Sequence, residues 1–426
     1  MGETSQQRLT AFWAAFGPGL LWAAAAIGVS HLVQSTRAGA DAGLGLAGVI
    51  LLALIVKYPF FEFGPRYAAA TGTSLVEGYR RIGRWALWLY FAITVSTSLV
   101  IQSAIVLFTA FLLTYAFGLD WPLPFMGAVV LGGCAAMLWI GRFPWLDRMV
   151  KVILVLLAVS TVAAAVATLD RLDVGTLALL PPIGEGSGSV SFAFLLALVG
   201  WMPSAIDIAV WSSLWTLAKN EAARTTVSVT TARLDFGIGY VVTGFLAFSF
   251  LILGAGIMFG SGTSFSGAGT VFATQLVDLY GTTLGGWMRP VVLVAVITTM
   301  LSTAVTVVDG FPRAIERTVR NLREPLEVAA GRPGGGTAYW VALAVLGALT
   351  LLVLGAFVGS LTAMVDVATI VSFLTAPLLG YLNLRAVQSP DVAPEHRPSR
   401  RMVLLSWVGL ILLAGTAAVF LISVIR

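Results

Sequence analysis

The chain has 426 residues, of which 58% are apolar and only 11% carry a charge. Soluble domains average about 45–50% apolar and about 25% charged residues, so this composition excludes most soluble folds. A net charge of +5 could suit nucleic-acid binding, but the basic residues lie between apolar segments rather than along one surface. The 45 glycines agree with a membrane protein, since small residues let membrane helices approach closely. We therefore expect an all-α polytopic membrane protein.

Eleven predominantly apolar stretches follow one another along the chain, each long enough to cross a hydrocarbon core about 30 Å thick. The first begins near Ala11, lacks an A-x-A cleavage pattern and is interrupted by Gly17-Pro18-Gly19, so we interpret it as a retained helix rather than a signal peptide. The single cysteine, Cys134, predicts neither a disulfide nor a cysteine metal site. The predicted spans are 13–36, 43–65, 85–117, 123–140, 147–168, 190–215, 236–260, 287–308, 337–357, 360–384 and 402–425.

The distribution of charge predicts the orientation in the membrane. Arg8 and the connections after the second, fourth, sixth, eighth and tenth spans hold 20 of the 25 Lys and Arg residues. The opposite connections carry the acidic residues Asp120, Asp170, Asp173 and Glu185. By the positive-inside rule the basic side is cytoplasmic. We expect an inner-membrane protein with a cytoplasmic N-terminus and a C-terminus on the outer side.

A turn-forming stretch, residues 181–188, divides the first five spans from the next five. Because five is an odd number, the second set starts from the opposite face of the membrane, which is the topology of an inverted repeat. The predicted organisation is a first repeat at 1–168, an extracellular connection at 169–189, a second repeat at 190–384, and a cytoplasmic loop with helix 11 at 385–426.

The first span of each set is interrupted near its middle. Span one carries Gly28-Val29-Ser30-His31 and span six carries Gly200-Trp201-Met202-Pro203-Ser204. Glycine weakens a helix, and proline removes a backbone donor. A pair of broken helices in corresponding positions indicates a central transport site.

The polar groups at these breaks suit ligand binding, because an unwound helix frees backbone carbonyls and N–H groups. Ser30 is predicted to cap the second half of span one, and Asp207 follows Pro203 at the start of the second half of span six. His31 could ligate a cation, donate to a substrate, take up a proton, or bind a neighbouring helix. Met202 offers a soft thioether to a transition metal. The predicted substrate site comprises Gly28, Ser30, His31, Met202, Ser204 and Asp207.

Other ionisable residues also lie in or near the predicted spans. Arg37 and Asp41 are four residues apart and are predicted to form a structural pair. Lys57 and Glu62 do not share a helix face, so we expect each to find partners on other helices. Asp366 is predicted to face the central cavity. The candidates for coupling transport to protons are His31, Glu62 and Asp366.

The sequence has no Walker A loop, H-E-x-x-H motif or nucleophile elbow, so ATP hydrolysis and ordinary hydrolase chemistry have no support. We expect a protein that is not an enzyme, with no cofactor, no nucleic-acid partner and no obligate protein partner. Its expected partners are the lipid bilayer and a small transported ion or solute.

Several short motifs, in order and on the corresponding spans, resemble the Nramp family of proton-coupled divalent-metal transporters. Gly17-Pro18-Gly19 with Ala38-Gly39-Ala40 is similar to the family's first helix, and Arg66 with Thr71-Gly72 to the end of its second. Met202-Pro203 is similar to the start of its M-P-H-N motif, and Asp309-Gly310-Phe311 to the end of its eighth helix. The resemblance covers most of the chain and implies eleven or twelve helices in the LeuT-type inverted-repeat fold.

The departures from the family pattern fall at its functional positions. Where the family has D-P-G-N, with Asp and Asn as metal ligands, this chain has Gly28-Val29-Ser30-His31. M-P-H-N becomes Met202-Pro203-Ser204-Ala205, which keeps the methionine and loses the histidine. The proton-route segment T-D-L-A-E-V corresponds to residues 97–102, Thr-Ser-Leu-Val-Ile-Gln, so both carboxylates are missing.

Two functions stay open at this point. The resemblance implies divalent-cation transport, with Met202, Asp207 and His31 as the metal ligands of a rebuilt site that disfavours ordinary Mn²⁺ and Fe²⁺ specificity. A pocket with exposed half-helix N-termini and hydroxyl groups also suits a small polar or carboxylate-bearing organic solute.

Overall fold

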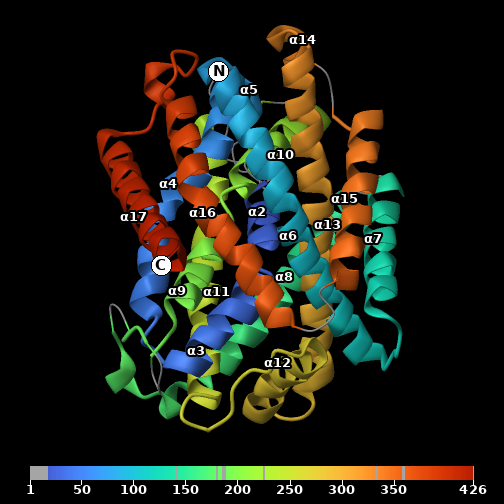
Figure 1. Ribbon diagram of the computed structural model, residues 1–426, viewed down its shortest axis with the longest axis vertical. Coiled ribbons are helices and arrows are strands. Elements are labelled where there is room, and N and C mark those ends of the chain that lie inside the picture. The colour runs from blue at the N-terminus through green and yellow to red at the C-terminus, as the bar shows by residue number, and fades with distance from the viewer. Residues whose placement is uncertain are drawn as a thin grey trace, which may run out of the picture.

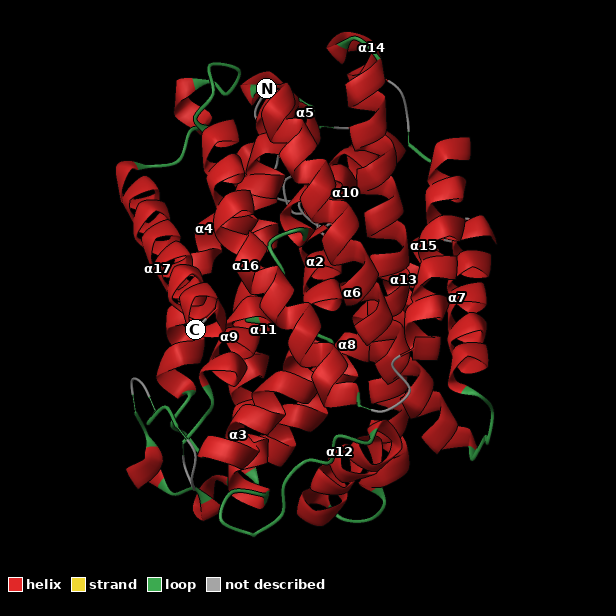
Figure 2. Ribbon diagram, viewed as in Figure 1, coloured by secondary structure: helices red, strands yellow, loops and turns green. Residues whose placement is uncertain are grey.

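The computed structural model describes residues 18–140, 143–178, 181–184, 189–223, 226–331, 334–356 and 360–425. The described chain is a bundle of helices, most of them aligned with its longest axis (Figures 1 and 2). Eight described helices are long and apolar enough to cross a membrane, as expected for a multi-pass membrane protein. Sequence features that lie outside the described residues are Arg8, Gly17, Arg142, residues 185–188, Arg224 and Arg332.

The first predicted span is a broken helix, as the sequence indicated. It consists of α2 (Pro18–Ala26), the π-helix η1 (Ser30–Ser35) and α3 (Thr36–Ala42). The following helices are α4 (Ala47–Thr71), α5 (Leu75–Ile82), α6 (Arg84–Phe117), α7 (Leu123–Ile140) and α8 (Phe143–Val166), and after them come the 3₁₀ turns η2 (Leu169–Arg171) and η3 (Val174–Thr176).

The sixth predicted span is also broken, into α9 (Phe192–Trp201) and α10 (Ile208–Ala223). The remaining elements are α11 (Val229–Ile257), α12 (Gly269–Leu284), α13 (Met288–Arg323), α14 (Leu326–Gly331), α15 (Thr337–Ala356), α16 (Leu361–Val387), η4 (Pro394–His396) and α17 (Arg400–Ile425).

Two parts of this second set differ from the sequence prediction. The stretch 261–286 was expected to be a connection, yet it contains α12, which is too short to span a membrane and packs by Phe272 against Phe108 of α6. The eighth span was expected to end near residue 308, but α13 continues to Arg323. The C-terminal half of α13 is polar, so hydropathy alone could not show that the helix continues.

The helices divide into a buried centre and a periphery. In α4, α6, α11 and α13, 61–67% of the most apolar 18-residue window is buried, against 22–28% in α7, α15 and α17. Figure 1 shows α17 along one side of the bundle and α7 with α15 along the other. Apolar side chains on the outer helices are exposed, such as Leu352 and Ile411, as expected where a helix faces lipid.

Glycines allow both broken helices to pack against their neighbours at backbone distance. A Cβ on Gly39 would lie 2.0 Å from the carbonyl oxygen of Leu251 on α11, and a Cβ on Gly200 would lie 2.1 Å from that of Thr369 on α16. No larger residue fits at either position without displacing backbone. These contacts fix α3 against α11 and α9 against α16.

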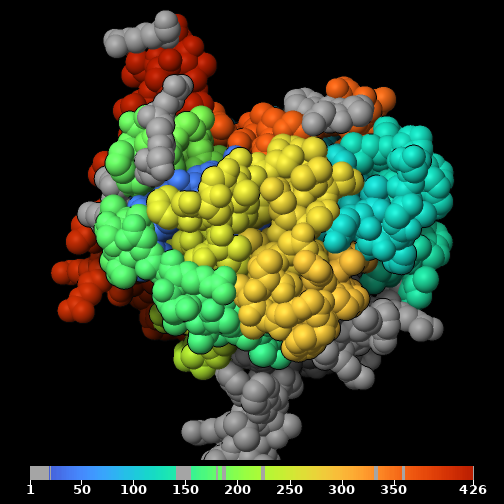
Figure 3. All heavy atoms as spheres, turned by 90° about the horizontal axis from the view of Figure 1, so that it is seen from below, coloured from blue at the N-terminus to red at the C-terminus, as the bar shows by residue number. Residues whose placement is uncertain are grey.

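The two ends of the bundle carry different elements. The helices α5 and α14 lie at one end, whereas α3 and α12 lie at the other (Figure 1). Seen from the end that carries α12, the segments coloured green, yellow and orange cover most of the centre, and little of the blue first segment shows between them (Figure 3).

Candidate functional site

The break in span one is shaped by Thr303 of α13. A Cβ on Gly28 would come within 2.9 Å of the Thr303 side chain, so glycine lets α13 approach the break. Thr303 Oγ1 lies 3.2 Å from the carbonyl oxygen of Ala24 and 3.3 Å from that of Ile27. The hydroxyl can therefore donate to a carbonyl that the break deprives of a helical partner.

The break in span six, residues 202–207, is satisfied by Lys57 of α4. The Nζ of Lys57 donates to the carbonyl oxygens of Val199 at 2.9 Å, Gly200 at 2.9 Å and Ser204 at 2.8 Å. The side chain is fully buried and also lies over the Phe61 ring. The expectation that Lys57 has its partners on another helix is confirmed.

A cavity of about 30 Å³ lies between the two breaks. A water molecule requires about 10–15 Å³ of such space, so the cavity has room for about two waters or one small ion. Its polar lining consists of hydroxyl, indole and backbone groups. The lining residues are Ala25, Ala26, Val29, Ser30, Ile101, Ile105, Trp201, Ser204, Ala205, Ile208, Trp211, Thr303 and Val307.

Among the predicted substrate-binding residues, Ser30 and Ser204 line this cavity. Gly28 lies beside the lining residue Thr303, and Met202 is fully buried at the C-cap of α9. Sequence reasoning missed Trp201 and Trp211, although both flank the break of span six. The Trp201 Nε1 donates to Ser372 Oγ at 2.8 Å, whereas the Trp211 Nε1 is buried without a partner among the described residues.

The Ser30 side chain binds within span one, and the His31 side chain binds both Ser30 and α11. Ser30 was predicted to accept a hydrogen bond as an N-cap, but its Oγ lies 2.6 Å from the carbonyl oxygen of Ala26 and therefore donates. The His31 Nδ1 lies 2.7 Å from Ser30 Oγ, and its Nε2 lies 3.0 Å from the carbonyl oxygen of Thr243 on α11. A neutral imidazole with its proton on Nε2 donates to Thr243, and its Nδ1 then competes with the Ala26 carbonyl for the single proton of the Ser30 hydroxyl. His31 is therefore held against α11, as in the helix-binding role that the sequence left open.

Asp207 brings a carboxylate to α6, the helix in which the sequence lacks one. Its Oδ1 accepts a hydrogen bond from Thr97 Oγ1 at 3.2 Å, while its Oδ2 is buried without a partner among the described residues. A buried carboxylate oxygen without a partner is costly, so this atom is available to a proton, a water or a cargo ion. Thr97 belongs to the segment in which the expected proton-route carboxylates are missing.

Asp366 forms an ion pair with Arg37 and does not line the cavity. Arg37 therefore pairs with Asp366 rather than with Asp41. Arg37 Nη1 and Nη2 lie 2.8 and 3.3 Å from the two carboxylate oxygens of Asp366, and Gln34 Nε2 donates to Asp366 Oδ1 at 3.1 Å. The guanidinium also lies 4.7 Å from the centre of the Phe194 ring. The predicted Arg37–Asp41 pair is wrong because α16 presents a better aligned carboxylate to α3.

Glu62, a predicted coupling residue, is buried in an ion-pair cluster. Its carboxylate accepts two hydrogen bonds of 2.8 Å from Arg66 on the same helix and one of 2.5 Å from Arg233 on α11. Arg66 also donates to the carbonyl oxygen of His396 at 2.8 Å. The structure therefore places Glu62 between α4 and α11, away from the lining of the central cavity.

The predicted metal ligands are bound to different elements. His31 binds α11, and Asp207 binds α6. Within the described ranges, no group of three or more His, Cys, Asp or Glu residues could hold a metal ion. None of the proposed ligands Met202, Asp207 and His31 is among the residues that line the central cavity in this conformation.

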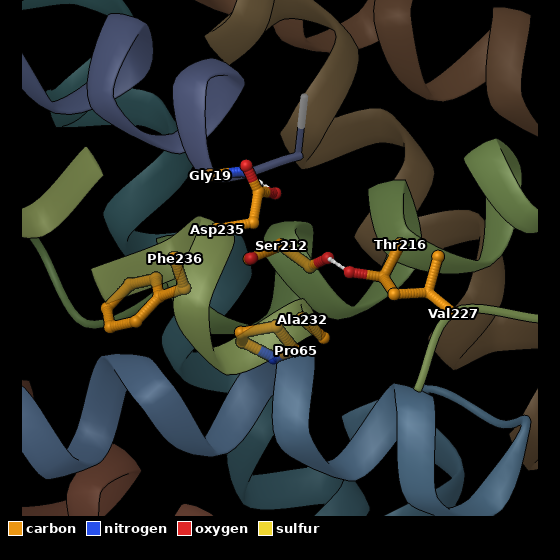
Figure 4. Close-up of a pocket in the computed structure, with 8 residues that line it drawn as sticks. All are labelled: Gly19, Pro65, Ser212, Thr216, Val227, Ala232, Asp235 and Phe236. Atoms are coloured by element: carbon orange, nitrogen blue, oxygen red, sulfur yellow. Dashed lines mark hydrogen bonds between the residues drawn. The ribbon is translucent and has the colours of Figure 1, made fainter. Parts of the chain in front are cut away.

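A second and smaller cavity, of about 10 Å³, lies among α2, α4, α10 and α11 (Figure 4). The backbone N–H of Gly19 donates to Asp235 Oδ2 at 2.7 Å on one side of it. On the other side, Thr216 Oγ1 donates to the carbonyl oxygen of Ser212 at 2.8 Å. This cavity has room for about one water and lies between α2, the first half of span one, and α10, the second half of span six.

Comparison with solved structures places the fold. A manganese transporter of Eremococcus coleocola, in complex with an aromatic bis-isothiourea substituted compound, superposes with a TM-score of 0.73 at 15% identity, over 98% of this chain and 88% of that one. Mhp1, a nucleobase-cation-symport-1 family transporter, gives 0.58 at 16% identity, over 95% and 92%. MhsT in complex with L-phenylalanine gives 0.58 at 17% identity, over 95% and 98%. The chain therefore has the LeuT-type fold with two broken helices.

Comparison of sequences identifies the family. An uncharacterized protein of Pasteurella multocida is 33% identical over 426 residues, which cover 99% of this chain and 96% of that protein. Residues 19–423 match the family described as natural resistance-associated macrophage protein-like, Nramp. This match spans nearly the whole chain, and the protein belongs to the Nramp family.

Proposed function

We propose that this protein is a secondary transporter that moves a divalent metal cation through the cavity between the two broken helices. The observation that carries the proposal is the position of the cavity, which is bounded by both breaks and has room for one small ion. Membership of the Nramp family and the fold shared with a manganese transporter support a metal cargo.

The lining supports a rebuilt site that disfavours ordinary Mn²⁺ and Fe²⁺ specificity. Cations of this kind are held in proteins by carboxylate, imidazole or thiolate groups, and the cavity lining has hydroxyl, indole and carbonyl groups instead. Met202 keeps its place at the break but is buried beside it rather than in the lining. A cation that retains part of its hydration shell suits such a lining best, because water supplies the missing oxygens.

We further propose alternating access across the inner membrane, with the basic end cytoplasmic, the N-terminus inside and the C-terminus outside. The ion pair of Arg37 with Asp366 joins the outer half of span one to α16, and the Glu62 cluster joins α4 to α11. Opening one of these contacts at a time would expose the cavity to one side of the membrane. The partners in this cycle are the bilayer and the cargo.

A small polar or carboxylate-bearing solute is the second candidate cargo. The observation that favours it is the Lys57 ammonium, which binds the carbonyl of the lining residue Ser204 and places positive charge beside the cavity. Positive charge attracts a carboxylate and repels a metal ion.

Calorimetry and transport in proteoliposomes test the proposal. We expect Mg²⁺, or another divalent cation that keeps part of its hydration shell, to bind and to be transported. Binding of Mn²⁺ should be weaker by about tenfold or more. Ser204→Ala and Ser30→Ala should weaken binding, whereas Ser406→Ala on the peripheral helix α17 should not. Micromolar Mn²⁺ binding that Met202→Ala abolishes would contradict the rebuilt site. Uptake of organic acids without uptake of any divalent cation would contradict the metal cargo.

A further inference from the structure

Lys57 is the buried cation nearest to the break of span six, and its partners are backbone oxygens. Its ammonium has three protons, and three carbonyl oxygens lie at 2.8–2.9 Å from Nζ. Within the described residues, Lys57 forms no ion pair with an acidic side chain. The arrangement matches a charged ammonium, whose three N–H groups provide one donor for each carbonyl. A neutral amine has two N–H groups and would leave one carbonyl without a donor.

The three oxygens would form a cation site if the lysine were absent. Val199 and Gly200 belong to the last turn of α9, where the helix dipole places partial negative charge; the Val199 carbonyl also accepts a hydrogen bond from the Met202 backbone N–H at 3.3 Å. Ser204 lies in the break itself, so its carbonyl is also free of a helix. Converging carbonyl oxygens from unwound or terminal helix are what membrane proteins use to bind alkali cations.

We propose that Lys57 is a tethered cation that permanently fills an oxygen site at the break of span six and so excludes exchangeable cations from it. The positive charge at this break then stays with the protein through the transport cycle. This inference goes beyond the proposed function and holds for either cargo.

The position of Ser204 connects this site to the central cavity. Ser204 lines the cavity and also gives its carbonyl to Lys57. A bare divalent cation in the cavity would therefore lie beside a fixed positive charge in a region with little water to screen it. Lys57 is in this way a specificity-determining residue, since removing its charge should make the cavity more favourable to cations.

A lysine that only completed the hydrogen bonds of α9 would behave differently when replaced. A neutral donor such as the amide of Lys57→Gln would restore a purely structural cap, because it still offers two N–H groups. A tethered cation is restored only by positive charge of the right size. The test therefore compares Lys57→Ala, Lys57→Gln and the wild type.

The experiment measures thermal unfolding and cation binding of purified protein in detergent without cargo. The probes are the chlorides of sodium, potassium, rubidium, methylammonium, ethylammonium and tetramethylammonium, with radioactive sodium and rubidium for direct binding. Tyr240→Phe is the matched control, since it removes a buried hydrogen bond from the Tyr240 hydroxyl to the carbonyl oxygen of Leu54 on α4 without changing charge.

We expect Lys57→Ala to be stabilised by ethylammonium or an alkali cation by about 2 °C or more. The wild type and Tyr240→Phe should show no such shift, and Lys57→Gln should not recover wild-type stability. Tetramethylammonium should have no effect because its four methyl groups keep its charge away from the carbonyl oxygens. Saturable binding of sodium or rubidium to Lys57→Ala, absent from the wild type, is the second expected result.

The inference is overturned if the wild type and Lys57→Ala respond alike to every cation, or if Lys57→Gln matches the wild type. A Lys57→Ala protein that cannot be purified should be recovered by ethylammonium added throughout, and failure of every amine and alkali cation to recover it also overturns the inference. Failure of the proposed function would show separately, as absent cargo transport by the wild type.

Discussion

The two ends of the molecule close the central cavity with different chemistry. At the end that carries α3 and α12, Arg37 pairs with Asp366, with side chains 14% and 30% exposed, and Arg289 pairs with Asp278, with side chains 52% and 43% exposed. Toward the opposite end, the acidic partners Glu62, Glu77, Asp309 and Glu316 are at most 5% exposed and bind arginines from several helices. Partly exposed pairs contribute little, whereas breaking a buried pair leaves an uncompensated charge. The comparison indicates that the contacts at the end with α3 and α12 open readily, whereas those toward the opposite end open at a high cost.

The largest effect should come from Glu77, which joins α5 to α13. Its carboxylate accepts hydrogen bonds from the Ser74 backbone N–H at 2.8 Å, Arg317 Nε at 2.7 Å and Asn321 Nδ2 at 2.6 Å. We expect Glu77→Ala to lower the free energy of unfolding by about 3–5 kcal/mol because Arg317 is left buried without its carboxylate. Unfolding in mixed micelles measures the change, and exposed Glu327→Ala on α14 is the control. Equal stability of the two variants would remove the asymmetry between the ends.

The next effect separates two arginines that share one carboxylate. Arg66 is buried and binds Glu62 through two hydrogen bonds, whereas the Arg233 side chain is 44% exposed. We expect Arg66→Met to lower the free energy of unfolding by about 2–3 kcal/mol. Arg233→Met should lower it by less than about 1 kcal/mol. The same unfolding assay compares them, and a larger loss in Arg233→Met would show that exposure does not rank these contacts.

The outer ion pair should affect conformation more than stability. We expect Asp366→Asn to change the free energy of unfolding by less than about 1 kcal/mol. The same change should make Ser204→Cys several-fold faster to label from outside, in a Cys134→Ala background, because α3 is released from α16. The labelling rate of Ser204→Cys is measured with and without Asp366→Asn. Equal rates would show that the Arg37–Asp366 pair does not close the cavity.

The last test, whose substitutions should perturb the protein least, asks which end of the bundle faces the cytoplasm. Ile183 and Val328 are exposed at opposite ends of the described chain. With the basic end cytoplasmic, a membrane-impermeant thiol reagent added outside intact cells should label Ile183→Cys and spare Val328→Cys. The reverse pattern would invert the comparison between the ends.

Periodic and compositional features allowed much of the fold to be predicted. The two breaks were visible because Gly28 and Pro203 interrupt otherwise continuous apolar spans, and the length of each span follows from the bilayer. The contacts inside the site were harder to foresee. Glu62 lies five residues from Lys57 on the same helix, yet the ammonium binds three carbonyl oxygens that lie 142–147 residues away in sequence. Sequence alone does not reveal which helix presents its carbonyls to a buried amine.

The same limitation explains the errors over charges. The spacing of Arg37 and Asp41 is correct for a helical pair, yet Asp366, 329 residues away, is the partner. Asp309 was taken to mark the end of a helix, but it lies inside α13, where Arg313, Trp215 and Tyr339 bind its carboxylate. Local spacing identifies the partners that a helix can offer, while packing between distant helices decides among them.

The π-helix Ser30–Ser35 would allow α3, which follows it, to rotate about the axis of span one. A π-helix carries more residues per turn than an α-helix, and such turns are rare outside functional sites. If one residue were drawn out of this stretch as it tightened to α-helical geometry, everything beyond it would turn by about 100° about the helix axis. Arg37 would then point away from Asp366, while α2 and its contacts with α11 stayed in place. The same rotation would turn Gly39 away from the Leu251 carbonyl of α11, so releasing the ion pair in this way requires α3 to separate from α11 as it turns.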